Sequence, residues 1–182
     1  MAIPRPAYWP KATLALLVGG ALVLVVLMLP PRARSLGACP EGAQPVRAAP
    51  PSGALQWCAR PHPAGRPVKD GPYVAWYPDG RTKMEGSYRG DTKEGRWTFW
   101  HPNGRKREEG EFREGREHGV WTRWHGNGHP LEAGPYRDGT RQGRWTVWHE
   151  NGRKDREGEY RDGVDIGAWA RWNLKGEPCD AP

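Results

Sequence analysis

The chain has few of the residues that fill most protein cores, with only 2 Phe and 3 Met among 182 residues. Trp numbers 11 and Gly 25, so apolar surface is supplied mainly by flat aromatic rings. A buried Trp removes roughly 150–250 Å² from water. This composition argues against one thick globular core and favours a thin sheet held together by rows of aromatic side chains.

Serine is scarce as well, and this limits nucleophilic catalysis. The serines are Ser35, Ser52 and Ser87, and none lies in the G-x-S-x-G sequence of a nucleophile elbow. Carboxylates recur once per repeat rather than as a converging pair. The recurring carboxylates are Glu85, Glu109 and Glu157. Such a column is typical of a solvated charged face, so we expect no catalytic residue and no enzyme.

Three histidines recur in the same way as the carboxylates. They are His101, His125 and His149. Equivalent residues two strands apart are separated by about 9.6 Å at the backbone, and no carboxylate or Cys recurs beside them to complete a tetrahedral metal site. We interpret them as surface residues and expect neither a metal ion nor a cofactor.

The net charge of +7 belongs almost entirely to the N-terminal part of the chain. Residues 1–70 contain 8 Lys and Arg against 2 Asp and Glu, whereas residues 71–182 contain 20 against 19. Nucleic-acid binding requires a basic surface on the folded part. We therefore expect no nucleic-acid partner.

One 24-residue unit repeats without insertion or deletion and forms the region 71–182. Its four full copies and a truncated fifth start at Gly71, Gly95, Gly119, Gly143 and Gly167. The unit reads G-x-W-x-x-W, then an Asn-Gly or Asp-Gly pair, then E-G-x-Y-R-x-G with minor variants. A fixed period of this length predicts a solenoid of small units.

The unit contains two aromatic columns, which hold nine of the eleven tryptophans. The first column is Tyr73, Trp97, Trp121, Trp145 and Trp169. The second column is Trp76, Trp100, Trp124, Trp148 and Trp172. Asn-Gly and Asp-Gly favour two-residue type I′ turns, so each unit is predicted to be a hairpin of an antiparallel sheet.

A two-residue loop at Asn103-Gly104 would place Trp97 opposite Gly110 and Trp100 opposite Arg107. The first column then shares a face with glycine and is the better candidate for the buried ladder. The second column lies among charged residues and could stack on a ligand, or be stabilised by cation–π contacts with residues such as Lys83. A loop of another length would reverse the two faces.

An uncharged run of 18 residues, 12–29, lies near the N-terminus and is long enough as a helix to cross a bilayer. We favour a transmembrane signal anchor over residues 1–29, with a cleaved signal peptide or a lipidation site at Cys39 as alternatives. Residues 30–54 are expected to be an extended Pro/Ala-rich linker, and residues 55–70 an N-terminal cap of the repeats.

Three cysteines bear on the compartment of the repeat region. Cys39 and Cys58 flank a short segment, and a disulfide between them would fit an exported domain. Unpaired small hydrophobic residues are the alternative. A bond between Cys58 and Cys179 is excluded in an open solenoid, because the two ends lie too far apart.

The third copy deviates from the others, with His129-Pro130-Leu131 and Pro135 at positions that are mostly charged elsewhere. Proline removes a donor from the ladder. We expect a bulge or an irregular strand there.

Over residues 71–176, at G-x-W-x-x-W-x-x-N-G and E-G-x-Y-x-x-G-x-x-x-G, the chain resembles bacterial MORN-type repeats, in particular the YwqK-like antitoxin variant. The resemblance implies an all-β, elongated antiparallel hairpin sheet, and MORN-like repeats act as protein-binding scaffolds or membrane-associated modules. The family motif consists of Gly and aromatic residues that serve the fold, so no catalytic residue is carried over.

These observations predict a non-catalytic repeat module, anchored to a membrane through residues 12–29, with its repeats outside the cytoplasm. Its expected partner is a protein or a cell-envelope polymer, bound through the second tryptophan column. An antitoxin or immunity protein that neutralises a toxin is the alternative, and a secreted or periplasmic protein is the alternative location.

Overall fold

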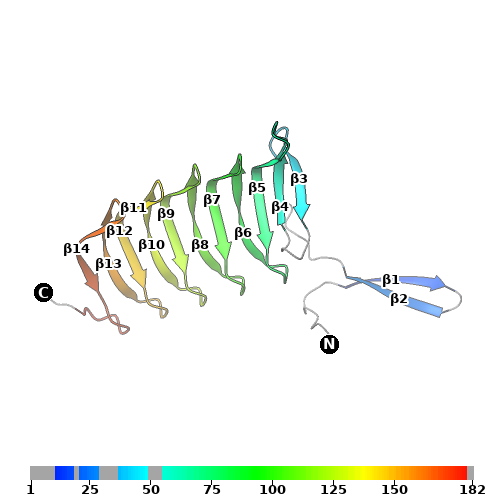
Figure 1. The fold of residues 1–182 in the computed structure, drawn as a ribbon. Coiled ribbons are helices and arrows are strands. Elements are labelled where there is room, and N and C mark those ends of the chain that lie inside the picture. Colours follow the sequence, from blue (N-terminus) through cyan, green and yellow to red (C-terminus); the bar gives the residue numbers. More distant parts are fainter. Residues whose placement is uncertain (1–10, 19–20, 29–36, 49–54, 180–182) are drawn as a thin grey trace, which may run out of the picture.

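A computed structural model describes residues 11–18, 21–28, 37–48 and 55–179, and its strands form two antiparallel sheets (Figure 1). The strands are β1 (Lys11–Val18), β2 (Ala21–Met28), β3 (Gln44–Ala48), β4 (Leu55–Arg60), β5 (Val68–Trp76), β6 (Thr82–Arg89), β7 (Thr92–Trp100), β8 (Lys106–Arg113), β9 (Arg116–Trp124), β10 (Pro130–Arg137), β11 (Thr140–Arg141), β12 (Gly143–Trp148), β13 (Lys154–Arg161) and β14 (Val164–Arg171).

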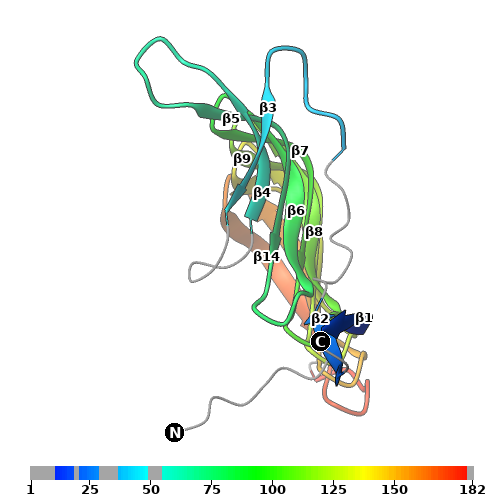
Figure 2. The same ribbon diagram turned by 90° about the vertical axis from the view of Figure 1, so that its right-hand side faces the viewer.

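The larger sheet has 12 strands, and almost every strand pairs with the next one along the chain. Its order is β14-β13-β12-β10-β9-β8-β7-β6-β5-β4-β3, with β11 paired to β10. Figure 2 looks along this row and shows the strands behind one another. The antiparallel hairpin sheet predicted for the repeats is therefore present, and it is open at both ends.

The apolar run near the N-terminus is not a helix in the described residues. β1 and β2 pair as an antiparallel hairpin in which Val18 lies opposite Ala21. Both strands are rich in Val and Leu, and Gly19-Gly20 between them is a dipeptide that favours a two-residue hairpin turn. The expected helix is therefore replaced by two strands over residues 12–18 and 21–28, while residues 19, 20 and 29 lie outside the described part. Among the described residues, no helix is long and apolar enough to span a membrane.

Part of the expected linker belongs to the sheet. β3 pairs with β4 along its whole length, and the Sγ atoms of Cys39 and Cys58 form a disulfide across a sequence separation of 19 residues. Within the expected spacer of residues 30–54, residues 44–48 form a strand, because β4 offers them a partner and the disulfide holds the segment beside it. Residues 30–36 and 49–54 lie outside the described part.

The Asn-Gly turns are not the expected two-residue type I′ turns. After β7, the Gly104 N–H donates to the His101 carbonyl (2.9 Å) and the His101 N–H donates to the Arg105 carbonyl (2.8 Å). The loop therefore has three residues, and of these only Gly104 has positive φ. This is a type I turn followed by a glycine bulge. Asn103 closes it with its side chain rather than a left-handed backbone, since Oδ1 accepts from the Arg105 N–H (3.0 Å).

Type I′ turns occur instead at the opposite end of each unit. Their central residues all have positive φ, as this turn requires, and are Gly90-Asp91, Glu114-Gly115, Asp138-Gly139 and Asp162-Gly163. In each case the flanking residues pair directly, as Arg113 and Arg116 do. These turns set the return to the next unit, and two of them are Asp-Gly pairs, the same signal that the sequence shows at Asp79-Gly80.

The three-residue loop changes the register only near the turn. Trp97 pairs with Gly110, as predicted, whereas Trp100 pairs with Lys106 rather than Arg107 because a β-bulge precedes it. The alternation of side chains before the bulge is kept, so the two columns lie on opposite faces. We call the face of the first column the core face and the face of the second column the tryptophan face.

The third copy has the irregular strand that its prolines predict. Pro135 cannot donate to the ladder, and its carbonyl accepts from the Gln142 N–H (2.9 Å), which lies between the two pieces of the opposite strand. The strand opposite β10 is consequently divided into β11 and β12. A β-bulge also lies between Pro130 and Glu132, but the other hairpins have bulges at the same place.

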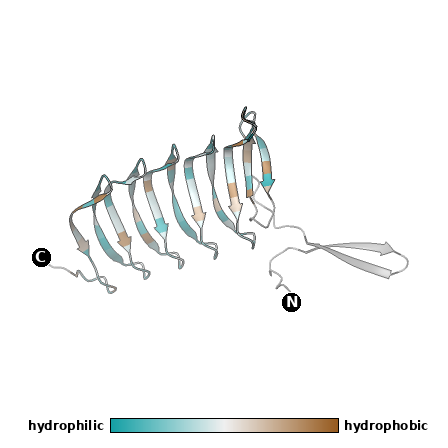
Figure 3. Cartoon of the chain, in the orientation of Figure 1, coloured by the Kyte–Doolittle hydropathy of each residue, from teal (hydrophilic) through white to brown (hydrophobic). Residues whose placement is uncertain are grey.

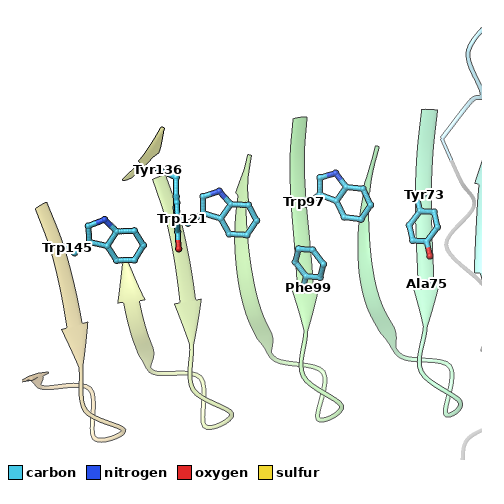
Figure 4. Packing of buried hydrophobic residues seen from close by; sticks show 7 residues of the cluster. All are labelled: Tyr73, Ala75, Trp97, Phe99, Trp121, Tyr136 and Trp145. Atoms are coloured by element: carbon cyan, nitrogen blue, oxygen red, sulfur yellow. The ribbon is translucent and has the colours of Figure 1, made fainter. Parts of the chain in front are cut away.

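The buried side chains form one row on the core face, drawn in Figure 4. Trp97, Trp121 and Trp145 are at most 1% exposed, and each ring contacts aromatic side chains on both sides, as Trp121 does with Phe112 (5.0 Å) and Tyr136 (6.4 Å). Figure 3 shows only scattered apolar positions on the strands of the larger sheet, separated by hydrophilic ones. Edge-to-face aromatic contacts stabilise such a ladder beyond the area they bury.

Each core tryptophan lies flat on a glycine of the preceding strand. Trp121 pairs with Gly134 through the backbone, yet its ring covers Gly110, where an added Cβ would lie 2.3 Å from the indole. Its Nε1 donates to the Glu111 carbonyl (3.1 Å). A tryptophan ring therefore covers a glycine, as predicted. The covered glycine lies on the preceding strand, however, and not on the strand whose glycine pairs with the tryptophan backbone.

Candidate functional site

The second tryptophan column forms a line across the tryptophan face, from β5 to the end of β14. All five rings are half-buried. A lysine of the preceding unit lies over two of them, with Lys106 Nζ 5.8 Å from the Trp124 ring and Lys154 Nζ 5.5 Å from the Trp172 ring. The column thus presents partly accessible indoles at a regular pitch, which is a surface suited to stacking on a ligand or partner.

The cation–π contacts proposed for this column from the sequence involve other residues. Lys83 lies over Tyr77 (5.8 Å), and Arg107 lies over Phe99 on the core face (5.6 Å). The β-bulge before Trp100 explains the difference for Arg107, because it directs Lys106 rather than Arg107 to the tryptophan face.

The recurring histidines hold the second column in place. The Nε2 atoms of His101, His125 and His149 lie 3.0, 3.0 and 2.9 Å from the carbonyl oxygens of the tryptophans in the following unit. A carbonyl only accepts, so each Nε2 carries the proton. The histidines are half-buried and link neighbouring turns; they are not exposed surface residues. Within the described residues, no three His, Cys, Asp or Glu side chains are placed to hold a metal ion.

The turn asparagines make a second link between units, which sequence reasoning missed. The Nδ2 atoms of Asn103, Asn127 and Asn151 donate to backbone carbonyls of the next turn at 2.6, 2.7 and 2.8 Å. The recurrence of Asn at one place was visible in the sequence, but it was attributed to backbone conformation alone. The two links fix the spacing of the tryptophans along the column.

Copies two and four carry a charged cluster between the tryptophans. Glu109 accepts from Arg96, from Lys106 (2.7 Å) and from the Thr98 hydroxyl (3.2 Å). Glu157 has the same three partners in Arg144, Lys154 and Thr146. Hydrogen bonds from Lys154 and Arg144 lower the pKa of Glu157 to about 2. Two of the three recurring carboxylates are therefore held in ion pairs.

Glu157 should make stability depend on pH in an acidic window. Because its pKa is lowered in the folded state, its contribution is present above about pH 4.5 and is lost as pH falls towards 2. We expect the wild-type melting temperature to exceed that of Glu157→Gln at pH 6, and the difference to shrink steadily below pH 4.5. Glu150→Gln, at a side chain that is 82% exposed, is the control and should show no such trend. A constant difference for Glu157→Gln would contradict this role.

Copy three lacks the charged cluster and is apolar at the same positions. Val120, Ala133 and Pro130 replace the arginine, glutamate and lysine, and Pro135 replaces a further glutamate. Val120 is 67% exposed, and the three others are half-buried, with Pro130 opposite Trp124 and Pro135 opposite Val120. The tryptophan face therefore alternates between charged and apolar stripes from one copy to the next.

A shallow cleft of about 420 Å³ lies at the C-terminal end of the tryptophan face. Ala168 and Ala170 line it because they are small where other copies have Arg and Thr, and Arg144, Glu157 and Ile166 form its other walls. It continues the surface of the column.

The core face carries a network of charges beside the aromatic row, which sequence reasoning also missed. Arg123 binds Glu108 (3.2 Å), Glu117 (2.9 Å) and Glu132 (2.6 Å), and Arg141 binds Glu132 (2.9 Å). These residues contact one another across several strands, so no spacing within one unit reveals them. Arg123 lies over the Trp121 ring (5.9 Å) and Arg141 over the Trp145 ring (4.0 Å), so the network covers the middle of the core face.

Comparison with known proteins bears on the central hairpins. Residues 93–114 and 117–138 match the family model described as MORN repeat variant, and these segments contain β7 with β8 and β9 with β10. No curated protein matches the chain. The two matches support a MORN-type repeat for these hairpins, and the fixed 24-residue period relates the flanking hairpins to them.

Proposed function

We propose that this chain is a non-catalytic repeat module that binds a protein or a cell-envelope polymer through its tryptophan face. The observation that carries the proposal is the line of five half-buried tryptophans, Trp76, Trp100, Trp124, Trp148 and Trp172, held at a fixed pitch on one face. Partly exposed indoles combine large apolar area with few rotatable bonds, which makes them effective anchors in interfaces.

The arrangement of the two faces supports this choice of surface. The core face is closed by its own aromatic row and by the charges around Arg123. On the tryptophan face, the carbonyls of the column are bound by histidines of the preceding turn, so the indoles are placed rigidly before a partner arrives. A preorganised surface loses less conformational entropy when it binds a partner.

The binding test compares the full-length protein with two double variants. Trp100→Ala with Trp148→Ala removes two anchors, and we expect at least a tenfold loss of binding to envelope material of the producing cell, since interface anchors of this kind are each worth about 2 kcal/mol or more. Arg137→Ala with Arg161→Ala changes two exposed side chains at the type I′ turns and serves as the control. Equal binding by all three proteins, at unchanged melting temperature, would contradict the proposal.

Membrane attachment through residues 12–29 is part of the same proposal. It is supported by the uncharged, apolar sequence of the run, whose described part is a hairpin rather than a membrane-spanning helix, and by the disulfide, which is typical of exported proteins. We expect the mature protein to keep its N-terminus and to remain with membranes after alkaline washing. Mass spectrometry that finds an N-terminus near Leu36 would show cleavage instead and leave export standing.

The resemblance of residues 71–176 to the YwqK-like antitoxin repeats suggests a second role, in which the partner is a toxin. A neighbouring toxin-like reading frame in the genome is the observation that would favour it over a structural or envelope partner.

A further inference from the structure

The tryptophan face has a pattern that is symmetric about the third copy. Charged stripes in copies two and four flank the apolar stripe of Val120, Pro130, Ala133 and Pro135. The strands in question follow one another as β7, β8, β9, β10, β12 and β13. The centre of this set of six lies between β9 and β10.

The six strands are paired without a net shift along their length. One straight row of paired residues crosses all of them, and its members are Thr98, Glu109, Thr122, Ala133, Thr146 and Glu157. Arg96 pairs with Glu111, and Arg144 pairs with Glu159, two residues from this row on the same side. These four charged side chains therefore lie at one height on the tryptophan face.

We propose that a second copy of the chain docks on the tryptophan face, with a two-fold axis parallel to the strands between β9 and β10. This rests on the proposed function, because it names the protein that the face binds. The axis places β7 against β13 of the second copy, β8 against β12, and β9 against β10. Sheets packed in this way lie about 10 Å apart with their strands roughly aligned.

The charges of the two copies are complementary in this arrangement. Arg96 faces Glu159 of the other copy, and Glu111 faces Arg144 of the other copy. Neither Glu111 nor Glu159 has an ion-pair partner among the residues that the structure describes, and the side chains of Arg96 and Arg144 are 70% and 72% exposed. Each contact occurs twice by symmetry, as a two-fold interface requires.

The apolar and aromatic groups also meet suitable partners. Val120 faces Pro135 of the other copy, and Trp124 faces Pro130. The lysine ammonium of Lys106 faces the Trp148 ring, which is a cation–π arrangement. A shift of the axis by one strand would bring the exposed Val120 against Glu111 or Glu159 of a charged stripe, so the centre on copy three is preferred.

The contact is expected to be weak. Six strands span about 29 Å, and about five residues of each strand give about 17 Å, so each partner contributes about 500 Å² of flat surface. This lies at the low end for specific interfaces. We expect a dimer that dissociates at micromolar concentration.

Charge reversal within the stripes provides a test that keeps the net charge constant. Arg96→Glu with Glu111→Arg keeps a positive and a negative side chain on this stripe, although it removes the ion pair between Arg96 and Glu109, and it puts like charges opposite each other across the two-fold axis. Arg144→Glu with Glu159→Arg does the same for the other stripe. The fourfold variant restores opposite charges between the copies.

The measurement is sedimentation of the four full-length proteins in detergent over a range of concentrations. We expect the wild type and the fourfold variant to dimerise with similar affinity, and each double variant to bind at least about tenfold more weakly. Arg96 and Glu159 lie five strand spacings apart in one chain, about 24 Å, so rescue by the fourfold variant cannot arise within a monomer. Dimerisation of either double variant like wild type would overturn the proposal.

A second pair of variants guards against loss of folding. Val120→Glu should weaken the dimer, whereas Val164→Glu, at a similarly exposed residue next to a type I′ turn outside the six strands, should not. A wild-type chain that stays monomeric at every concentration would overturn the dimer and leave the envelope-binding test of the proposed function unaffected. If the wild-type chain neither dimerises nor binds envelope material, the tryptophan face is not an interaction surface.

Discussion

Gly110→Ala is expected to lower the free energy of unfolding by about 3 kcal/mol, although it adds only one methyl group. The new Cβ would lie 2.3 Å from the indole of Trp121. The ring has little room to move, because its Nε1 is bound to the Glu111 carbonyl and Phe112 packs against it at 5.0 Å. Overpacking a core typically costs 1–3 kcal/mol, sometimes more.

Thermal unfolding measures the effect, and a loss of about 3 kcal/mol corresponds to a decrease of about 6–12 °C for a chain of this size. Gly126→Ala is the matched control. No atom lies within 4 Å of a Cβ at Gly126, and its φ is outside the left-handed region. We expect the control to change stability by less than about 0.5 kcal/mol. A similar loss of stability in both variants would mean that glycine matters for the conformation of the chain, and not because the Trp121 indole packs against Gly110.

Trp121→Ala is expected to destabilise the chain far more than Trp124→Ala, although the two residues are three positions apart. Trp121 is 1% exposed, and truncating a buried Trp costs about 3–5 kcal/mol. Trp124 is half-buried on the other face, with Lys106 over its ring. We expect less than half the loss for Trp124→Ala in unfolding experiments, and the reverse order in binding. Equal destabilisation would contradict the assignment of the two faces.

The sequence predicts the architecture because local signals agree with the period of the repeat. Gly next to aromatic residues, recurring every 24 residues, gives the hairpins, their order in the sheet and the choice of Trp121 rather than Trp124 for the core. The pairing of Trp97 with Gly110 also matches the prediction, because the β-bulge between Phe99 and Trp100 offsets the extra residue of the loop.

The remaining errors come from side chains that act between units. Asn103 was assigned a left-handed backbone, but it closes its own turn with Oδ1 and reaches the next turn with Nδ2. The sequence shows that Asn recurs at this place in the unit. It does not show whether the backbone or the side-chain amide of the residue makes the structural contact. The network around Arg123 joins three strands and has no local signature. Residues 12–18 and 21–28 were predicted as helix from apolar length, and the β-forming Val residues and the glycine pair outweigh this signal.

Oxidative footprinting of the tryptophans, read by mass spectrometry, tests the division into a core face and a binding face most directly. In the dilute full-length protein, the account predicts fast oxidation of Trp100, Trp124 and Trp148 and slow oxidation of Trp97, Trp121 and Trp145. Envelope material that the protein binds, or a high protein concentration, should then protect only Trp100, Trp124 and Trp148 from oxidation. Equal rates for the two sets, or protection of Trp121 rather than Trp124, would contradict the account.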